Sequence, residues 1–372
     1  MESLEIKIHK SANILPPEER TRVIASHPKF GEVFTDHMLI AQYDRENGWH
    51  NFEVTELAEL KMHPASHVIH YGQSIFEGMK AYHQPDGSVA TFRPRVNAER
   101  FAASARRLAM PPISEEMFLK AIQALVETDR DWVPTEFGES LYLRPIMFSR
   151  DKQLLTKPSA TYTFVVLASP VANYFQNGVQ PVNVWASREY IRAAPGGTGE
   201  AKCAGNYAAG LAAQQEAIDH GCEQVIWLDA HDRKAIEEMG GMNVYFVFRD
   251  GDRVKLVTPQ TTGTILKGVT RDSILTLAQD CGFEVEQRRI ELNEWKAACT
   301  EGLMTEAFAC GTAAIVVPIG RVRSVDGEFA VGDGQTGPIA SMVRNKLLSI
   351  QHGLEPDTHG WLYPLLKANH AA

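Results

Sequence analysis

One lysine of the chain stands among small residues rather than among other charges. Residues 196–207 read GGTGEAKCAGNY, and Lys202 has no acidic residue at helical spacing. We expect a helix to begin close to this lysine, where the positive end of the helix dipole disfavours a second positive charge. A neutral amine is stable there, and burial lowers the pKa of a lysine as Schiff-base chemistry requires. Lys202 is therefore a candidate nucleophile, with an exposed surface lysine as the alternative.

The glycines around this lysine do not form a nucleotide-binding P-loop. In that motif, G-x-x-x-x-G-K-[ST], the lysine follows the last glycine directly. Here Glu200 and Ala201 follow Gly199, and Cys203 takes the place of the hydroxyl residue. The chain also has no G-x-S-x-G, H-E-x-x-H or strand-linked G-x-G-x-x-G motif. Serine-hydrolase, zinc-protease and dinucleotide-binding signatures are therefore absent from the sequence.

Three other segments have the chemistry to hold a phosphate. The predicted helix start at Val269 and Thr270 and the tight turn at Thr312 and Ala313 each present backbone N–H groups to an anion. Arg100, on another predicted helix, is the candidate cation, although a lone helical arginine is usually a surface residue. Each feature alone is weak evidence. Together with the lysine they suggest a phosphorylated cofactor.

Two adjacent glutamates, Glu237 and Glu238 in IEEMGGMN, are the candidate acids. If the cofactor is a pyridine, one of these carboxylates can keep its ring nitrogen protonated. Such a pair gains about 4 kcal/mol at about 4 Å and an effective dielectric near about 20, before the cost of desolvation. A solvated loop residue before the Gly-Gly turn is the alternative.

Aromatic residues suit the wall of an apolar pocket, although core packing is the default for scattered aromatics. The candidates are Phe30, Tyr71, Phe76, Tyr142, Tyr174 and Tyr207. Three histidines in HPASHVIHYG have spacings that fit a metal, but a proline breaks the helix and no nearby carboxylate or cysteine completes the set. We expect no metal.

Composition narrows the class of protein. The chain has 372 residues, 44% of them apolar, and a net charge of -9, which argues against nucleic-acid or anionic-membrane binding. Its five cysteines include no C-x-x-C pair, which fits a reducing cytoplasm better than a disulfide framework. No stretch approaches the roughly 20 apolar residues of a membrane span, and the N-terminal residues contain no apolar signal core. We expect a cytoplasmic protein.

Strands and helices alternate in both halves of the chain. In the first half we predict strands and hairpins over residues 33–44 and 67–94, a helix over 97–110 capped by Asn97, a helix over 113–132 capped by Ser114, and strands over 140–149 and 161–169. In the second half we predict a helix over 202–222, a strand over 223–230, a hairpin over 242–260, a helix over 269–282, a strand–turn–strand over 304–322 and a helix over 339–353. The expected fold is α/β or α+β, with domains at 1–175 and 184–372 joined by a linker at 176–183.

Eight blocks in order then identify a resemblance. They are YGQSIFEGMKAY, FRPRVNAERFAASARRLAMP, YLRPIMF, KCAGNYAAGLAAQQEA, EQVIWLDA, IEEMGGMN, GVTRDSIL and EAFACGTAAIVVP. From about Lys29 to Lys346 the chain resembles the branched-chain amino acid aminotransferases of the fold-type IV class of pyridoxal-phosphate enzymes. The resemblance implies a small open α/β sandwich domain, a larger pseudo-barrel domain and a homodimer.

The resemblance also implies roles for individual residues. Lys202 matches the lysine that forms a Schiff base with pyridoxal 5'-phosphate, and Tyr207 the tyrosine at the phenolic oxygen of the cofactor. Glu238 matches the carboxylate at the pyridine nitrogen, because the family pattern E-x-G-x-M-N places Glu237 one position early. The positions matching the phosphate ligands are Arg100, Val269, Thr270 and Thr312.

The implied reaction is the reversible transfer of the amino group of L-leucine, L-isoleucine or L-valine to 2-oxoglutarate. The aromatic residues Phe30, Tyr71, Phe76, Tyr142 and Tyr174 would line the side-chain pocket. Arg144 would meet the second carboxylate of glutamate, and the turn at Thr312 and Ala313 the α-carboxylate. The alternatives are a D-amino-acid aminotransferase or an aminodeoxychorismate lyase of the same fold, and a non-catalytic binding protein on this scaffold.

The chain departs from the family pattern in three places. Residues 314–317 read AIVV, where some relatives carry a redox C-x-x-C, so we expect no such thiol switch. Cys310, just before the turn, is expected to be a buried structural thiol. Gly241 stands where relatives often have a hydroxyl residue, which removes one possible polar contact near the cofactor.

Overall fold

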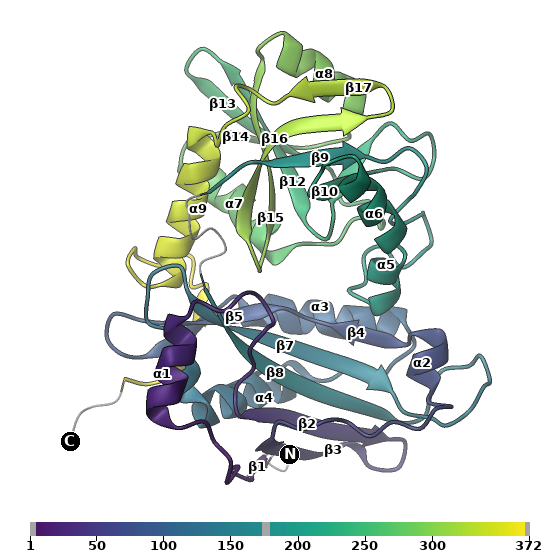
Figure 1. Ribbon diagram of the computed structural model, residues 1–372, viewed down its shortest axis with the longest axis vertical. Coiled ribbons are helices and arrows are strands. Elements are labelled where there is room, and N and C mark those ends of the chain that lie inside the picture. The colour runs from purple at the N-terminus through teal and green to yellow at the C-terminus, as the bar shows by residue number, and fades with distance from the viewer. Residues whose placement is uncertain (1–4, 173–178, 369–372) are drawn as a thin grey trace. The chain divides into compact units, whose positions relative to one another are not determined.

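The computed structural model describes residues 5–172 and 179–368. The chain forms two compact units (Figure 1). The first comprises residues 1–174, 201–204 and 348–372, and the second comprises residues 175–200 and 205–347. The short segment 201–204 and the C-terminal residues thus belong to the first unit, although they follow parts of the second in sequence. The predicted linker at 176–183 lies partly outside the described residues, and the predicted domain division stays a proposal.

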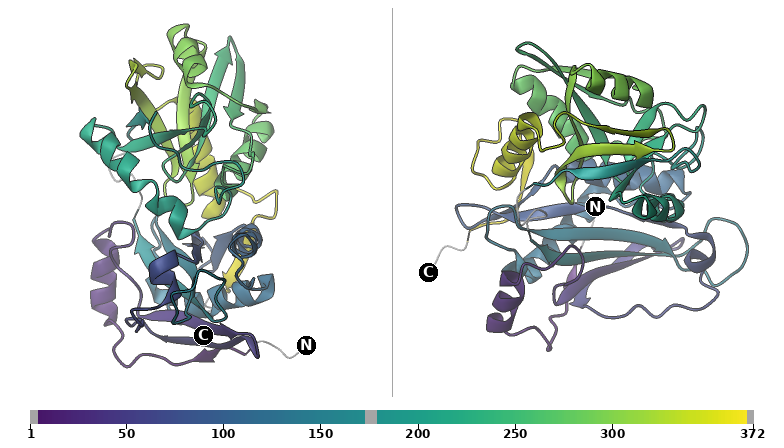
Figure 2. Two further views of the ribbon diagram at one scale, coloured as in Figure 1. Left: turned by 90° about the vertical axis from the view of Figure 1, so that its right-hand side faces the viewer. Right: turned by 45° about the horizontal axis from the view of Figure 1, so that its top comes forward.

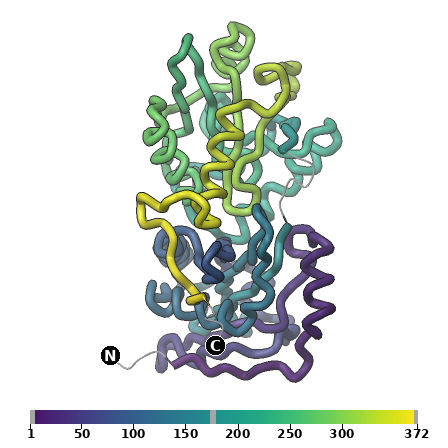
Figure 3. Tube along the Cα trace, turned by 90° about the vertical axis from the view of Figure 1, so that its left-hand side faces the viewer, coloured from purple at the N-terminus to yellow at the C-terminus, as the bar shows by residue number. Residues whose placement is uncertain are grey.

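The first unit contains a nine-stranded sheet among its described residues, with the path β1-β3-β2-β8-β7-β5-β6-β18 and β4 paired with β7. Its strands are β1 (Lys7–Ile8), β2 (His37–Asp44), β3 (Gly48–Glu56), β4 (Ser74–Phe76), β5 (Met79–His83), β6 (Val89–Phe92), β7 (Ser140–Ser149), β8 (Tyr162–Val171) and β18 (Leu362–Leu366). All pairs are antiparallel except β1 with β3. Strand β18, near the yellow end of the chain in Figure 3, was not predicted.

Helices α3 (Pro94–Arg107) and α4 (Glu115–Thr128) pack on one face of this sheet and bury its main core. The helices of the unit are α1 (Pro17–Ala25), α2 (His67–Tyr71), α3 (Pro94–Arg107) and α4 (Glu115–Thr128), with a 3-10 turn at Arg130–Trp132. The ring of Phe101 on α3 lies 5.5 Å from Phe118 on α4 and 5.7 Å from Phe164 on β8. Ser114 caps α4, as predicted, because its hydroxyl accepts from Met117 N at 3.2 Å.

Two local predictions in this unit are wrong. Asn97 does not cap α3: the helix begins earlier, at Pro94, after Arg93 in the left-handed conformation (φ 50°). Proline is favoured at the first helical position because its missing N–H has no partner there anyway. Asn97 lies inside the helix and its buried side chain faces Glu77. Residues 67–71 form the short helix α2 rather than a strand.

The second unit also contains a nine-stranded sheet among its described residues, with the path β11-β10-β9-β16-β15-β12-β13-β14 and β17 paired with β16. The ribbon of this unit runs from teal to yellow in the two views of Figure 2. Its strands are β9 (Val182–Ala186), β10 (Gln224–Leu228), β11 (Ile236–Met239), β12 (Asn243–Asp250), β13 (Arg253–Thr258), β14 (Glu284–Gln287), β15 (Met304–Gly311), β16 (Ile315–Ser324) and β17 (Gly327–Ala330). The β12–β13 hairpin is confirmed, with Asp250 paired to Arg253 across the turn.

The remaining helices are α5 (Ala204–Ala208), α6 (Leu211–Asp219), α7 (Val269–Asp280), α8 (Leu292–Thr300) and α9 (Pro338–Gln351). The predicted helix over 202–222 is therefore two short helices, and Lys202 precedes the first of them. Helix α7 begins directly after Gly268, as predicted. Glu306 accepts from the first N–H groups of α9, at Ile339 (3.0 Å) and Ala340 (2.9 Å), which satisfies donors that the helix itself leaves unpaired.

Within the described residues, every helix is too short or too polar to cross a bilayer. The same residues contain no group of three or more histidine, cysteine or acidic side chains arranged to hold a metal ion. The histidines of HPASHVIHYG have other contacts: His70 Nε2 lies 2.8 Å from Pro64 O, and the buried His67 packs against Tyr71.

Candidate active site

The backbone of Lys202 is fixed inside the first unit. Its N–H donates to Ser104 Oγ on α3 at 2.9 Å, and its carbonyl accepts from Phe76 N on β4 at 3.0 Å. The next residue, Cys203, forms a β-bridge with Ile75. The lysine therefore lies on an extended segment held by a helix and a strand, not on a helix face.

The environment of Lys202 favours its neutral amine. The pKa of Lys202 is lowered to about 8, chiefly by burial and further by the positive charges of Arg100 and Arg144, while Glu77 and Tyr142 oppose these effects. Nζ lies 4.8 Å from the centre of the Phe76 ring. A lysine with a pKa near 8 is partly unprotonated at neutral pH, which is the state that a nucleophile or general base needs.

Arg100, the predicted phosphate ligand, is paired with a carboxylate that the sequence analysis missed. Arg100 Nε and Nη2 donate to Glu77 Oε1 and Oε2 at 2.6 and 2.8 Å, and Asn97 Nδ2 donates to Oε2 at 2.8 Å. Burial has the largest single effect on Glu77 and by itself would raise its pKa, but the charge and hydrogen bonds of Arg100, the charge of Lys202 and the Asn97 hydrogen bond together lower it. Glu77 is thus a buried carboxylate that orients Arg100 by a two-point contact.

Arg144 is enclosed by three predicted aromatic residues. Its guanidinium carbon lies 4.9 Å from the ring centre of Phe76, 5.2 Å from that of Tyr142 and 6.0 Å from that of Phe30. Nη2 donates to Tyr142 Oη at 3.1 Å. The buried Nε has no hydrogen-bond partner among the described residues. A cation in an aromatic enclosure with an unused donor is suited to binding a carboxylate.

Gly78 has no side chain, which leaves space for the hydroxyl of Tyr142 beside Arg144. A Cβ atom at Gly78 would lie 2.1 Å from Tyr142 Oη, so any other residue would displace the tyrosine that Arg144 contacts. The structure therefore brings Lys202 and Arg100 together with Phe76, Tyr142 and Arg144 in one unit.

Tyr71, another predicted pocket aromatic, has different contacts. Tyr71 packs against His67, and its hydroxyl donates to Leu154 O at 2.7 Å. Tyr174 lies outside the described residues.

Glu238 is the centre of a buried cluster in the second unit. It lies on β11, not in a solvated loop, and only 2% of its side chain is exposed. Oε1 accepts from Leu266 N at 2.8 Å and from Asn243 Nδ2 at 3.2 Å. Arg192 Nε lies 2.8 Å from Oε2. The carboxylate is held in one orientation by contacts on both oxygens.

Its neighbour Glu237 is buried on the same strand but has a different environment. Its Oε1 accepts from Thr264 Oγ1 at 2.5 Å, and its Oε2 has no partner among the described residues. Burial raises the pKa of Glu237, although the Thr264 hydrogen bond and the charge of Arg192 partly offset it. The two adjacent glutamates are therefore chemically distinct.

The start of α7 is tied to the Glu238 cluster. Val269 and Thr270 are the first two helical residues, so their N–H groups have no intrahelical acceptor. A Cβ atom at Gly268 would lie 2.0 Å from Asn243 Oδ1, so glycine is required for this close approach. The same Asn243 donates to Glu238, and it thereby links the start of α7, with its free N–H groups, to the carboxylate.

The turn with Thr312 and Ala313 joins β15 to β16 in the same unit. A Cβ atom at Gly311 would lie 3.3 Å from Met242, which places this end of the turn beside the residues that follow Glu238. Ile315 closes the turn with φ 65°, a strained conformation for a β-branched residue. Tyr207 lies beside the loop between β11 and β12, because a Cβ atom at Gly241 in that loop would be 3.2 Å from the tyrosine ring.

These residues fit pyridoxal phosphate. The second unit has a clamped carboxylate suited to a protonated ring nitrogen and a helix start suited to a phosphate. The first unit has the lysine of lowered pKa and an oriented arginine. Cys310, buried beside the turn, has a pKa raised far above its usual value by burial, as expected for a structural thiol.

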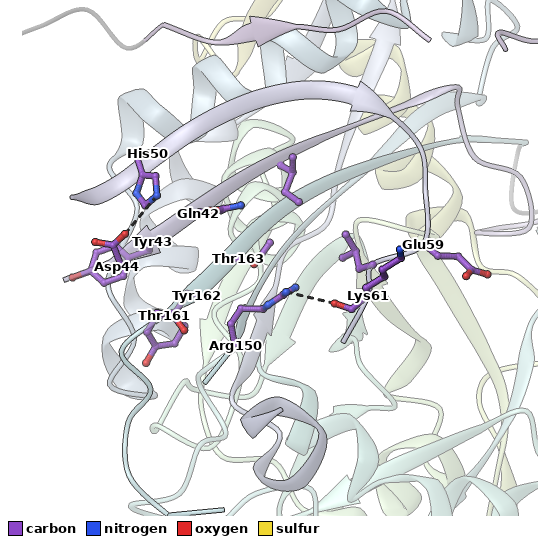
Figure 4. A pocket seen from close by; sticks show the side chains of 12 residues that line it. Gln42, Tyr43, Asp44, His50, Glu59, Lys61, Arg150, Thr161, Tyr162 and Thr163 are labelled. Carbon is purple, nitrogen blue, oxygen red and sulfur yellow. Dashed lines mark hydrogen bonds and ion pairs between the residues drawn. The ribbon is translucent and has the colours of Figure 1, made fainter. Parts of the chain in front are cut away.

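A cavity of about 410 Å³ lies elsewhere in the first unit (Figure 4). It is lined by residues of β2, β3 and β8 and of the loop after β3, among them Gln42, His50, Lys61 and Thr163, and by Arg150, which follows β7. None of the predicted site residues lines it. Its acids are Glu59 and Asp44, whose Oδ2 lies 3.5 Å from His50 Nε2, and its lining residues include neither Lys202 nor Glu238 nor the start of α7.

Comparison with known proteins agrees with this chemistry. Residues 74–322 match the family model of class IV amino-transferases. The branched-chain-amino-acid aminotransferase of Mycolicibacterium smegmatis is 48% identical over 97% of this chain and 99% of its own. The crystal structure of the Escherichia coli branched-chain amino acid aminotransferase has a TM-score of 0.73 at 30% identity, over 89% of this chain and 99% of its own.

A third similar protein is another branched-chain amino acid aminotransferase, whose crystal structure holds N-(5'-phosphopyridoxyl)-L-glutamate. It has a TM-score of 0.68 at 29% identity, over 88% of this chain and 98% of its own. The fold and site define a class IV aminotransferase of fold type IV. Within that class, the chain belongs to the branched-chain amino acid aminotransferase family.

Proposed function

We propose that this chain interconverts L-leucine, L-isoleucine and L-valine with their 2-oxo acids by way of Lys202, with 2-oxoglutarate accepting the amino group. The reaction class is that of its family: branched-chain amino acid transamination that depends on pyridoxal phosphate, with glutamate as the partner. The observation that carries the residue assignment is the pKa of Lys202, lowered to about 8 at the position of the family lysine.

Lys202 is proposed as the covalent attachment point of the cofactor and as the base at the substrate. Bound pyridoxal phosphate supplies the electron sink that makes the Cα proton of an amino acid removable. The unprotonated Nζ of Lys202 takes that proton and returns it during the reverse step. The aromatic face of Phe76, 4.8 Å from Nζ, gives the amine an apolar neighbour that restricts its motion.

The other cofactor ligands are proposed from the charge and hydrogen-bonding capacity of their side chains. Glu238 provides the negative charge for the ring nitrogen, and Tyr207 a hydroxyl for the phenolic oxygen. Arg100, oriented by Glu77, provides a cation for the phosphate. The remaining phosphate ligands are proposed to be Val269, Thr270 and Thr312.

Substrate selection is proposed to depend on Arg144 and the aromatic residues around it. A branched apolar side chain would pack on Phe30, Phe76 and Tyr142. The second carboxylate of glutamate would take the unused Nε donor of Arg144, so one pocket would serve both substrates. The turn at Thr312 and Ala313 would bind the α-carboxylate. Tyr71 and Tyr174 are also proposed to line the side-chain pocket.

We also propose a homodimer, in which the first unit contributes to the neighbouring site. The support is an exposed apolar surface near Tyr71 in this unit. Leu154 and Leu155 are 63% and 60% exposed, Ile69 is 57% exposed, and the hydroxyl of Tyr71 ties its helix to the leucine loop. Exposed apolar groups of this kind gain free energy when a partner covers them. A cytoplasmic location is proposed because all five cysteines are unpaired thiols.

The test is a product assay on the purified protein. With L-leucine and 2-oxoglutarate we expect equal amounts of the branched 2-oxo acid and L-glutamate, and a matching loss and recovery of the visible cofactor band. Each half-reaction is run separately, with D-alanine in parallel. A response to D-alanine but not to L-leucine would overturn the assignment in favour of a D-amino-acid aminotransferase of the same fold. No visible band would indicate a non-catalytic binding protein.

A further inference from the structure

Arg192 is a buried cation of the second unit that the proposed reaction has not used. Only 8% of its side chain is exposed, and its Nε lies 2.8 Å from Glu238 Oε2. The N–H of Nε does not point along that line, so the contact is an ion pair rather than a linear hydrogen bond. A charge in such a place is stable only when it is compensated. The position of Arg192 is thus linked to the charge of Glu238.

Two backbone carbonyls fix the guanidinium. Arg192 Nη2 donates to Gly199 O at 3.0 Å and also to Thr264 O. The loop that contains Thr264 presents Leu266 N to the other oxygen of Glu238 at 2.8 Å. Arg192 and this loop therefore contact different oxygens of the carboxylate, and Arg192 is also bonded to the loop through Thr264 O.

The glycine-rich stretch before Lys202 is part of this clamp. A Cβ atom at Gly199 would lie 2.4 Å from Thr264 O and 2.6 Å from Ala193 Cβ. Only glycine allows the two backbones to come this close, and the close approach is what lets one nitrogen of Arg192 reach both carbonyls. A glycine at position 199 is therefore needed for Arg192 to keep both of its backbone hydrogen bonds beside Glu238.

The adjacent Glu237 shows what burial does to a carboxylate without this ion pair. It has one hydrogen bond, from Thr264 Oγ1, and its pKa is raised by burial. Glu238 is more deeply buried, with 2% of its side chain exposed, yet it has the guanidinium at 2.8 Å and two N–H donors. A positive charge at that distance favours the ionised form of a carboxylate. Arg192 is therefore in direct ion-pair contact with Glu238, whereas its charge only partly offsets the effect of burial at Glu237.

We propose that Arg192 is the positioning residue of Glu238, which keeps this carboxylate ionised and directed at the ring nitrogen of the cofactor. The inference rests on the proposed function, because it concerns the same cofactor site. Arg192 itself touches Glu238 and backbone carbonyls, so it acts through the glutamate.

The test measures pyridoxal phosphate affinity in the apoprotein by fluorescence titration. Arg192→Gln should bind the cofactor about 10- to 100-fold more weakly, as happens when the residue behind a buried charged ligand is lost. Arg192→Lys, which keeps the charge but not the fork of donors, should recover part of that loss and part of the visible band. Glu237→Gln is the matched control, adjacent in sequence and also buried, and should change the affinity by less than about threefold.

A double variant separates this role from a structural one. If Arg192 acts through Glu238, then Arg192→Gln combined with Glu238→Gln should bind the cofactor no more weakly than Glu238→Gln alone. Losses that simply multiply would overturn the proposal, as would an unchanged affinity in Arg192→Gln. If Arg192→Gln does not fold, the double variant should, because it leaves no uncompensated buried charge, and failure of both to fold would mean that Arg192 is structural.

The wild-type protein distinguishes failure of this inference from failure of the proposed function. If the wild-type apoprotein does not bind pyridoxal phosphate, the proposed function is wrong. If it binds the cofactor and all Arg192 variants bind equally well, only the role of Arg192 is wrong.

Discussion

The two units carry opposite charge arrangements around their central residues. In the first unit, the buried carboxylate Glu77 interacts with the cations Arg100 and Lys202, and Arg144 is a further cation that acts on Lys202. In the second unit, one arginine faces the adjacent buried glutamates Glu237 and Glu238. An excess of cations suits phosphate and carboxylate groups, and an excess of carboxylate suits a protonated ring nitrogen. Each unit is therefore complementary to a different part of a pyridine phosphate cofactor and its substrate.

Burial also shifts pKa values in opposite directions in the two clusters. It lowers the pKa of Lys202 and raises the pKa of Glu237, because in both cases the charged form loses hydration. For Glu77 the contacts with Arg100, Lys202 and Asn97 together outweigh burial, so its pKa is lowered. The comparison shows that the partners of a buried group, and not burial alone, set the direction of its pKa shift.

The largest expected effect is the loss of the lysine itself. Lys202→Ala should lower turnover by more than about 10³-fold and remove the covalent cofactor band, because both the attachment point and the base are lost. Absorbance and single-turnover rates with L-leucine would measure this. Lys267→Ala, at an exposed lysine on the other unit, is the control and should leave both unchanged. An unchanged spectrum in Lys202→Ala would rule out the assignment.

The next test compares the two glutamates of the second unit. Glu238→Gln should lower kcat by about 10²-fold, because a neutral amide cannot stabilise a protonated ring nitrogen as the carboxylate does. Glu237→Gln should lower it by less than about threefold, since that side chain is not ion-paired. Steady-state kinetics on L-leucine would measure both. A larger loss of kcat in Glu237→Gln than in Glu238→Gln would mean that Glu237, and not Glu238, matches the family carboxylate.

A smaller effect is expected at Glu77. Its negative charge raises the pKa of Lys202, so Glu77→Gln should move that pKa below its value of about 8. The neutral amine exists above the pKa, so the rate at which the apoprotein captures pyridoxal phosphate should rise with pH through about 8 in the wild type and through a lower pH in the variant. Stopped-flow absorbance from about pH 6 to about pH 10 would measure both midpoints. A midpoint shifted upward would contradict the charge arrangement described for the first unit.

The smallest effect is expected on substrate choice. Tyr142→Phe removes the hydroxyl that accepts from Arg144 Nη2 and should raise KM for 2-oxoglutarate by about 5- to 10-fold. KM for L-leucine should change by less than about twofold, because the ring remains. Gly78→Ala, which displaces the same tyrosine, should affect both substrates. Equal effects of Tyr142→Phe on both substrates would mean that Arg144 does not discriminate between them.

Local sequence signals predicted local structure well. Ser114 with the apolar pattern after it, and the Asp250-Gly251 turn between two apolar runs, identified α4 and the β12–β13 hairpin. The prediction that Asn97 caps α3 was wrong because the helix starts earlier, at Pro94, after Arg93 in the left-handed conformation. In that case a backbone constraint outweighed a side-chain capping preference.

The supporting residues of the site could not be found in this way. Glu77 pairs with Arg100 across 23 residues of sequence, and Arg192 pairs with Glu238 across 46. Only the tertiary fold brings these side chains together, so neither has a local motif. The residues that match the family pattern were predictable, whereas the buried partners that set their charge and orientation were not.

The central claim is that the cofactor is attached to Lys202, and chemical trapping tests it most directly. The holoenzyme is reduced with borohydride, digested and examined by mass spectrometry for a phosphopyridoxyl group. We predict one modified peptide, with the group on the lysine of the sequence EAKCAGNY. A modification at any other lysine, with Lys202 unmodified, would contradict it.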